Sequence, residues 1–230
     1  MIAPDFTHLA EVGSTNDWLL ARAAELPDNH WVLADRQTAG RGRRGRAWGD
    51  GAGNLMASVL VKAEGPVQQL SFVGALALHA ALGQGARIRL KWPNDLLLDG
   101  VKLSGILLER SGDALVIGFG ANLATFPEGT DRPATSLAAA GLPVPAPAAV
   151  LAALMTAFAQ VRALWAAQGF EPIRSRWLAH AAGVGDRIAA RLGDTTLEGR
   201  FEGLAPDGAL ALRLDDGSLR PVHAGEVFAL

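Results

Sequence analysis

Apolar positions along the chain recur with two different periods, and these periods predict most of its elements. Short and nearly unbroken apolar runs over 31–34, 54–62 and 116–122 predict buried strands, and residues 7–12 predict another short strand. Helical spacing predicts an amphipathic helix over 66–82, with Pro66 in its first turn, and helices over 148–168 and 172–182. Ser14 and Thr15 stand where they could cap a helix that continues to about residue 26.

Charged residues interrupt the apolar pattern between 87 and 109. The simplest prediction there is a strand, a turn at Asp99 and Gly100, and a second strand, with Pro93 breaking the first ladder. Lysine and aspartate are rarely buried unless they are paired. Lys91, Asp95 and Lys102 therefore either form a lysine–carboxylate pair at a strand end or belong to a functional site.

The pattern changes after residue 183. Polar and apolar residues alternate over 187–192, 195–204, 209–214 and 219–230, and turn sequences rich in glycine and aspartate separate these stretches. This alternation predicts a small antiparallel barrel of roughly 45 residues. We therefore expect two domains, 1–183 and 184–230, with a connection rich in proline, alanine and glycine over 130–147 of the first.

Composition excludes several classes of protein. The chain has 230 residues, half of them hydrophobic, a net charge of -2 and no cysteine. Disulfides and cysteine-ligated metals are thereby excluded, and the five histidines are scattered without metal-ligand spacing, so we expect no metal site built by the protein alone. We see no secretion signal and no apolar stretch of about 20 residues, and expect a cytoplasmic protein without a membrane span.

Positive charge is concentrated in residues 40–48, where four arginines and three glycines precede Trp48. Arginine presents a fixed fork of donors that matches phosphate and carboxylate oxygens, and glycine allows close approach of the backbone to a ligand. Gly40, Gly42 and Gly45 also spell a dinucleotide-binding motif, but residues 47–54 are too poor in helix formers to follow it. The composition favours a flexible cationic loop that closes over an anion.

Four separated blocks, taken with residues 118–122, resemble the biotin–protein ligases. They are Gly13-Ser14-Thr15-Asn16, Gln37-Thr38-Ala39 running into the arginine loop, Lys91-Trp92-Pro93-Asn94-Asp95-Leu96, and Lys102-Leu103-Ser104-Gly105-Ile106-Leu107. The resemblance covers the chain from about residue 6 to its end. It implies an α+β fold like the catalytic domain of class II aminoacyl-tRNA synthetases, with a mixed sheet, flanking helices and a C-terminal SH3-like β-barrel.

The resemblance also implies a reaction and its residues. Biotin and ATP, with Mg²⁺, would form biotinyl-5′-AMP, and a lysine of a biotin carboxyl carrier domain would then accept the biotinyl group. The implied catalytic residues are Lys102, Arg43, Asp95 and Lys91. The implied biotin-binding residues are Ser14, Thr15, Gln37, Gly40, Arg41, Arg43, Lys102, Gly105, Gly118 and Gly120. The implied nucleotide-binding residues are Arg43, Arg44, Arg46, Trp48, Asn94, Lys102 and Asn122.

Two alternatives remain open at this point. A lipoate or octanoate ligase or transferase would share the fold, although such proteins lack this dense arginine loop. A nucleic-acid-binding module could use the arginine run, although the acidic overall charge disfavours it. Some family members carry an N-terminal DNA-binding domain; this chain begins at the first predicted strand, so we expect no operator binding. A homodimer is possible within the family.

Overall fold

The computed structural model describes residues 6–49, 51–62, 65–128 and 133–230. Its first strands are β1 (Phe6–Leu9), β2 (Trp31–Ala34), β3 (Leu55–Val61), β4 (Ile88–Lys91), β5 (Asp95–Leu98), β6 (Val101–Ser111) and β7 (Ala114–Ala121). The helices are α1 (Thr15–Leu20), α2 (Leu70–Leu82), α3 (Pro147–Gln168) and α4 (Glu171–His180), with 3₁₀ turns η1 (Arg43–Gly45), η2 (Val67–Gln69) and η3 (Gly85–Arg87). The last strands are β8 (Arg187–Leu192), β9 (Thr195–Leu204), β10 (Leu210–Arg213), β11 (Leu219–Val222) and β12 (Glu226–Ala229).

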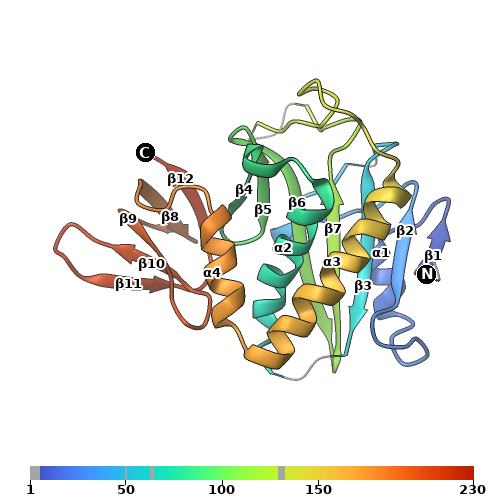
Figure 1. Cartoon of the computed structure of the whole chain (residues 1–230), viewed down its shortest axis with the longest axis horizontal. Helices are drawn as coiled ribbons and strands as arrows, with labels where there is room; N and C mark the ends of the chain where they lie inside the picture. Colours follow the sequence, from blue (N-terminus) through green and yellow to red (C-terminus); the bar gives the residue numbers. More distant parts are fainter. Residues whose placement is uncertain (1–5, 50, 63–64, 129–132) are drawn as a thin grey trace.

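A mixed seven-stranded sheet forms the centre of the molecule, in the order β1-β2-β3-β7-β6-β5-β4 (Figure 1). The β1–β2 pair is parallel and the other neighbours are antiparallel. Asp99 and Gly100 both have positive φ, as a tight two-residue hairpin turn requires. The expected turn there is confirmed, as are the strands expected over 31–34, 54–62 and 116–122 to within two residues.

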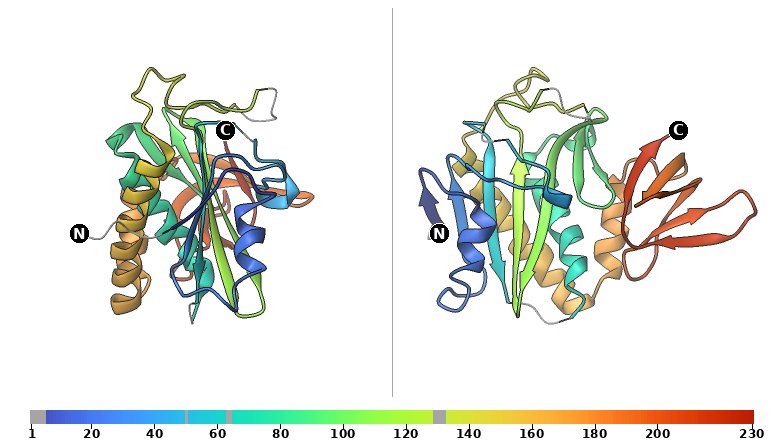
Figure 2. Two further views of the ribbon diagram at one scale, coloured as in Figure 1. Left: turned by 90° about the vertical axis from the view of Figure 1, so that its right-hand side faces the viewer. Right: turned by 180° about the vertical axis from the view of Figure 1, so that it is seen from behind.

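The two faces of this sheet are covered differently. Helices α2 and α3 cover one face, and α1 with the arginine-rich segment lies on the other (Figure 2). The large core fills the first face, while a small cluster of Leu19, Val32, Leu60 and Val116 lies under α1. Because α1 is short and covers only part of its face, the rest of that face is left for a cavity.

Four expectations about elements need correction. The helix over 66–82 is not amphipathic: α2 is buried around nearly its whole circumference, because α3 and α4 cover the side that faces away from the sheet. The stretch 87–98 forms two strands around Pro93 rather than one. Helix α1 ends at Leu20, and the stretch 219–230 forms two strands, β11 and β12. Part of the expected 130–147 connection, residues 130–132, lies outside the described residues.

The expectation that the chain has no apolar stretch of about 20 residues is wrong. Helix α3 is 22 residues long with a mean hydropathy of 1.5 over its most apolar window, enough by length and composition to cross a membrane. Its Val150, Leu151, Leu154 and Phe158 pack in the protein core, and alanines provide much of its remaining apolar character.

The C-terminal strands form a five-stranded antiparallel sheet in the order β11-β10-β9-β8-β12. This sheet packs against the end of the larger one (Figure 1). The Trp92 indole donates a hydrogen bond to the Gly208 carbonyl at 3.2 Å, and Arg174 Nε donates to the Leu204 carbonyl at 2.6 Å. The predicted α+β class, with a mixed sheet, flanking helices and a separate antiparallel C-terminal sheet, is confirmed. The packing brings β12 to the edge of the cavity described next.

Candidate active site

A row of glycines hollows the α1 face of the central sheet. Gly105 on β6 is paired with Gly120 on β7, and Gly118 lies two residues away on the same face. Three facing positions without side chains leave a depression in a sheet whose other face is filled. It is the floor of a cavity of about 450 Å³, lined by α1, the arginine loop, β4–β7 and β12.

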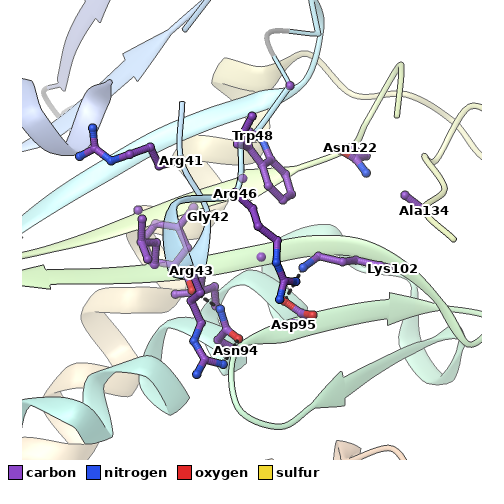
Figure 3. A pocket seen from close by; sticks show the side chains of 18 of the residues that line it. Arg41, Gly42, Arg43, Arg46, Trp48, Asn94, Asp95, Lys102, Asn122 and Ala134 are labelled. Atoms are coloured by element: carbon purple, nitrogen blue, oxygen red, sulfur yellow. Dashed lines mark hydrogen bonds and ion pairs between the residues drawn. The ribbon is translucent and has the colours of Figure 1, made fainter. Parts of the chain in front are cut away.

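A β-bulge directs Lys102 into this cavity. In a regular strand Lys102 and Gly105 would face opposite sides, but the register of β6 against β5 shifts between Leu96 and Leu97. Lys102 Nζ therefore reaches Asp95 Oδ1, at 2.8 Å, on the face where Asp95 is paired with Gly105. The lysine–carboxylate pair expected at a strand end thus exists, with Asp95 as the first residue of β5, and it lies inside the cavity (Figure 3).

The arginine segment forms a compact turn over the glycine floor. Its base is closed by the Trp48 amide, which donates to the Gly40 carbonyl at 2.9 Å, and the Gly42 amide donates to the Arg46 carbonyl at 2.7 Å. The Trp48 ring lies directly on the floor, because a Cβ added to Gly120 would be 2.4 Å from the indole Cε2. Glycine is required at this position for the ring to lie where it does.

Two arginines of this loop contact the C-terminal sheet. Arg43 Nη1 donates to Asn94 Oδ1 and to the Gly225 carbonyl, both at 3.3 Å. Arg46 forms an ion pair with Glu226 of β12. Burial lowers the pKa of the Arg43 guanidinium, and the nearby Asp95 partly offsets this effect. The cavity is therefore roofed by cations whose partners come from both sheets.

Arg41 points away from Arg43 and Arg46 (Figure 3). Its guanidinium binds both oxygens of Asp17, at 2.6 and 2.7 Å, and reaches Glu109 Oε1 at 3.3 Å. The hydrogen bond from Arg41 holds the pKa of the Asp17 carboxyl below its usual range, and the same bond raises the pKa of Arg41. These contacts attach the base of the loop to α1.

A buried polar network continues from Glu109 along the cavity wall. Asn16 Nδ2 donates to Glu109 Oε2 at 2.7 Å, and Ser58 Oγ lies 2.6 Å from Asn16 Oδ1 and 2.7 Å from Thr15 Oγ1. The Thr15 amide donates to Gln37 Oε1 at 2.8 Å. Ser14 caps α1 by accepting from the Asp17 amide at 3.4 Å, and it also lines the cavity. The capping and ligand-facing interpretations of Ser14 are therefore compatible.

Most residues implied by the resemblance converge on this one cavity. Those that line it are Ser14, Thr15, Gln37, Arg41, Arg43, Arg46, Trp48, Lys91, Asn94, Asp95, Lys102, Gly105, Gly118, Gly120 and Asn122. Gly40 does not line it, but a Cβ there would be 2.9 Å from Gln37 Nε2, so Gly40 allows the loop to begin against that side chain. Arg44, exposed and with positive φ, also lies outside the lining.

Four participants were not assigned a role from the sequence. Asn16 was quoted only as part of a block, Ser58 belongs to an apolar strand, and Glu109 ends one. A polar residue at an inward position of an apolar strand could have indicated Ser58, which is fully buried. Nothing in the local pattern could place Glu226 beside an arginine 180 residues earlier. Among the described residues, no group of three or more histidine, aspartate or glutamate side chains is placed to hold a metal ion.

Comparisons with known proteins agree with this geometry. Residues 9–122 match the biotin/lipoate A/B protein ligase family, and residues 183–230 match the biotin protein ligase C terminal domain. A biotin--[acetyl-CoA-carboxylase] ligase of Paracoccus denitrificans is 43% identical over 96% of this chain and 98% of its own length. A ligase of the same name from Mycobacterium tuberculosis is 34% identical over 96% of this chain and 88% of its own.

The solved structures extend the agreement to three dimensions. The biotin protein ligase of Aquifex aeolicus, in complex with biotin and ATP, superposes with a TM-score of 0.88 at 26% identity and covers 98% of this chain and 99% of that one. The ligase of Leishmania major with biotinyl-5-AMP gives a TM-score of 0.70 at 26% identity, covering 96% and 99%. This chain belongs to the biotin/lipoate A/B protein ligase family and, within it, to the biotin–protein ligases.

Proposed function

We propose that this protein activates biotin with ATP and transfers the biotinyl group to a lysine of a biotin carboxyl carrier domain. The observation that carries the proposal is the glycine-floored cavity roofed by Arg43 and Arg46, with Lys102 beside it. A carboxylate and a triphosphate repel each other, and such a cluster of cations lowers that repulsion. The relative from Paracoccus denitrificans bears the name of this activity, and the Aquifex aeolicus ligase was solved with both substrates.

In the first step, a biotin carboxylate oxygen attacks the α-phosphorus of ATP, and pyrophosphate leaves. Lys102 stabilises the negative charge that develops between carboxylate and α-phosphate, while Asp95 orients the ammonium by the 2.8 Å contact. Arg43, Arg46 and Lys91 bind phosphate oxygens, and Trp48, Asn94 and Asn122 hold the nucleoside. ATP would be used as its Mg²⁺ complex, and the metal would supply further charge neutralisation at the phosphates.

The biotin ring system lies toward α1, against Gly118 and between Ser14, Thr15 and Gln37. Gly40 and Arg41 close that end of the loop. Ser14, Thr15 and Gln37 are buried, and their polar atoms contact neighbouring protein groups, which suits recognition of a small polar ring. A lipoate ligase would need no such row of donors and acceptors, because the lipoyl ring is a dithiolane without amide groups.

In the second step, the carrier lysine amine attacks the acyl carbonyl of biotinyl-5′-AMP, and AMP leaves. The mixed anhydride is labile in water, so the arginine loop has to keep it covered until the amine arrives. Asp95 is the proposed group that receives or orients the incoming lysine amine, since it is the carboxylate in contact with Lys102.

The nucleic-acid alternative fits the geometry poorly. Arg41, Arg43 and Arg46 direct their guanidinium groups to protein acceptors, and only Arg44 of this run is both exposed and outside the cavity. A generic nucleic-acid surface would present such groups outward to phosphates. We therefore predict no binding to operator or generic DNA, which a gel shift near physiological salt tests. A cytoplasmic location and a homodimer remain predictions.

The decisive experiment is mass spectrometry of a recombinant biotin carboxyl carrier domain incubated with this protein, biotin and Mg-ATP. We expect a mass increase of one biotinyl group that disappears when the acceptor lysine is changed to arginine. Lipoate in place of biotin serves as the matched substrate control. Modification by lipoate and none by biotin would overturn the proposed substrate.

A further inference from the structure

Glu109 does not line the cavity, yet its two carboxylate oxygens hold two groups that do. It follows Gly105 and Leu107 on the same face of β6, and its side chain is 27% exposed. One oxygen accepts from Asn16 Nδ2 at 2.7 Å, and the other accepts from Arg41 Nη2 at 3.3 Å. The first contact fixes the orientation of the Asn16 amide.

A carboxylate accepts hydrogen bonds and donates none. The Asn16 amide must therefore turn its NH₂ group toward Glu109, which places Oδ1 on the opposite side. There Oδ1 lies across Gly118, since a Cβ added to that glycine would be 2.5 Å away, and 2.6 Å from Ser58 Oγ. Asn16 is only 4% exposed, so solvent cannot stabilise the reversed amide orientation.

The orientation of Asn16 fixes the hydroxyl proton of Ser58. Asn16 Oδ1 has no proton, so Ser58 Oγ, 2.6 Å away, donates to it. Thr15 Oγ1 lies 2.7 Å from Ser58 Oγ and 3.0 Å from Gln37 Oε1, and its single proton can serve only one of these two contacts. Gln37 Oε1, 2.8 Å from the Thr15 amide, accepts that N–H, and this leaves Gln37 Nε2 as a donor.

We propose that Glu109 is a positioning residue that fixes Asn16 Oδ1 as a hydrogen-bond acceptor on the cavity wall. The inference rests on the proposed function, because the ring of biotin is a cyclic urea with a carbonyl acceptor between two N–H donors. Asn16 accepts from a urea N–H, and Gln37 donates to the urea oxygen. A neutral residue at 109 would allow the Asn16 amide to flip, and Asn16 would then present its NH₂ group, a donor, on the side of Gly118 and Ser58.

The test compares Glu109→Gln with Asp17→Asn as a matched control. Each substitution removes one carboxylate from Arg41, but only Glu109→Gln removes the charge from Asn16. Calorimetry measures the affinity of each protein for biotin and for the two cyclic carbamate analogues, in each of which oxygen replaces one ring N–H. The wild type should bind one carbamate isomer about 10- to 100-fold more weakly than biotin, because the Asn16 acceptor then faces an oxygen.

In Glu109→Gln the affinities for biotin and for that carbamate isomer should differ by no more than about threefold, because the Asn16 amide can then turn and present a donor. Asp17→Asn should keep the wild-type difference, because Glu109 still holds Asn16 in this variant. Unchanged discrimination in Glu109→Gln would overturn the inference. If circular dichroism shows that Glu109→Gln is unfolded, Asn16→Ala replaces it, and wild-type discrimination in that variant also overturns the inference. Absence of biotin binding by the wild type would instead refute the proposed function.

Discussion

Replacing Lys102 by alanine tests the electrostatic basis of the proposed first step. The ammonium lies 2.8 Å from Asp95 Oδ1, and the side chains are 29% and 10% exposed, so the group acts in a largely desolvated site. Removing one preorganised partner of a developing oxyanion in such a site lowers kcat about 10²- to 10³-fold, equivalent to about 2.7–4 kcal/mol. We expect adenylate synthesis to fall by this factor.

The same substitution also leaves Asp95 without its nearest cation. Arg43 still attracts the Asp95 carboxylate, because Asp95 raises the pKa of the Arg43 guanidinium. The penalty should therefore be modest, about 1–2 kcal/mol, as for a partly buried group that loses a hydrogen-bond partner. For a chain of this size it would lower the Tm by roughly 2–8 °C, and the variant would remain folded at 25 °C.

Pyrophosphate release in the presence of biotin and Mg-ATP measures adenylate synthesis. Thermal unfolding measures the loss of stability in Lys102→Ala. Lys62→Ala is the control, because Lys62 is exposed at the end of β3, outside the cavity lining. Asp95→Asn keeps the ammonium but removes its partner, and it should lower the rate less than Lys102→Ala does. Pyrophosphate release within about threefold of the wild type in Lys102→Ala would refute the role assigned to this lysine.

Three further predictions concern the roof, the floor and the helical layer. Arg43→Gly should release more biotinyl-5′-AMP into the medium than the wild type, since the roof loses its contacts to Asn94 and Gly225; chromatography showing no increase would contradict a covering role. In Gly120→Ala the added Cβ would lie 2.4 Å from the present position of the Trp48 indole, so the ring should be displaced and biotin binding weakened by about 1–3 kcal/mol. Gly49→Ala is the control, because no atom lies within 4 Å of a Cβ added there, and it should leave biotin binding unchanged. Burial and the neighbouring His180 lower the pKa of His79 in the folded protein. The unfolded chain therefore binds a proton at this residue more readily, and the free energy of unfolding should fall as the pH drops below about 6.5. His79→Gln should weaken this dependence in acid denaturation; an unchanged slope would contradict it.

Local pattern was sufficient wherever an element's burial follows from its own residues. The strands at Trp31–Ala34 and Leu55–Val61 are predicted by apolar β-formers, and the turn at Asp99 and Gly100 by residues that tolerate positive φ. The same pattern was misleading for α2. A helix that is covered on both sides has no polar face, and the covering of α2 by α3 and α4 is visible only in the tertiary structure.

The candidate site divides in the same way. The sequence by itself determined which chemistries are available: guanidinium groups in a glycine-rich loop, two lysines beside aspartate, and small residues along two strands. Tertiary structure decided which of them meet. A register shift in β6 directs Lys102 toward Asp95, and the packing of two sheets brings Glu226 to Arg46. Glu109 reaches Asn16, 93 positions earlier, by the pairing of strands. Register and packing depend on contacts between distant segments, whereas periodicity reports only on neighbours along the chain.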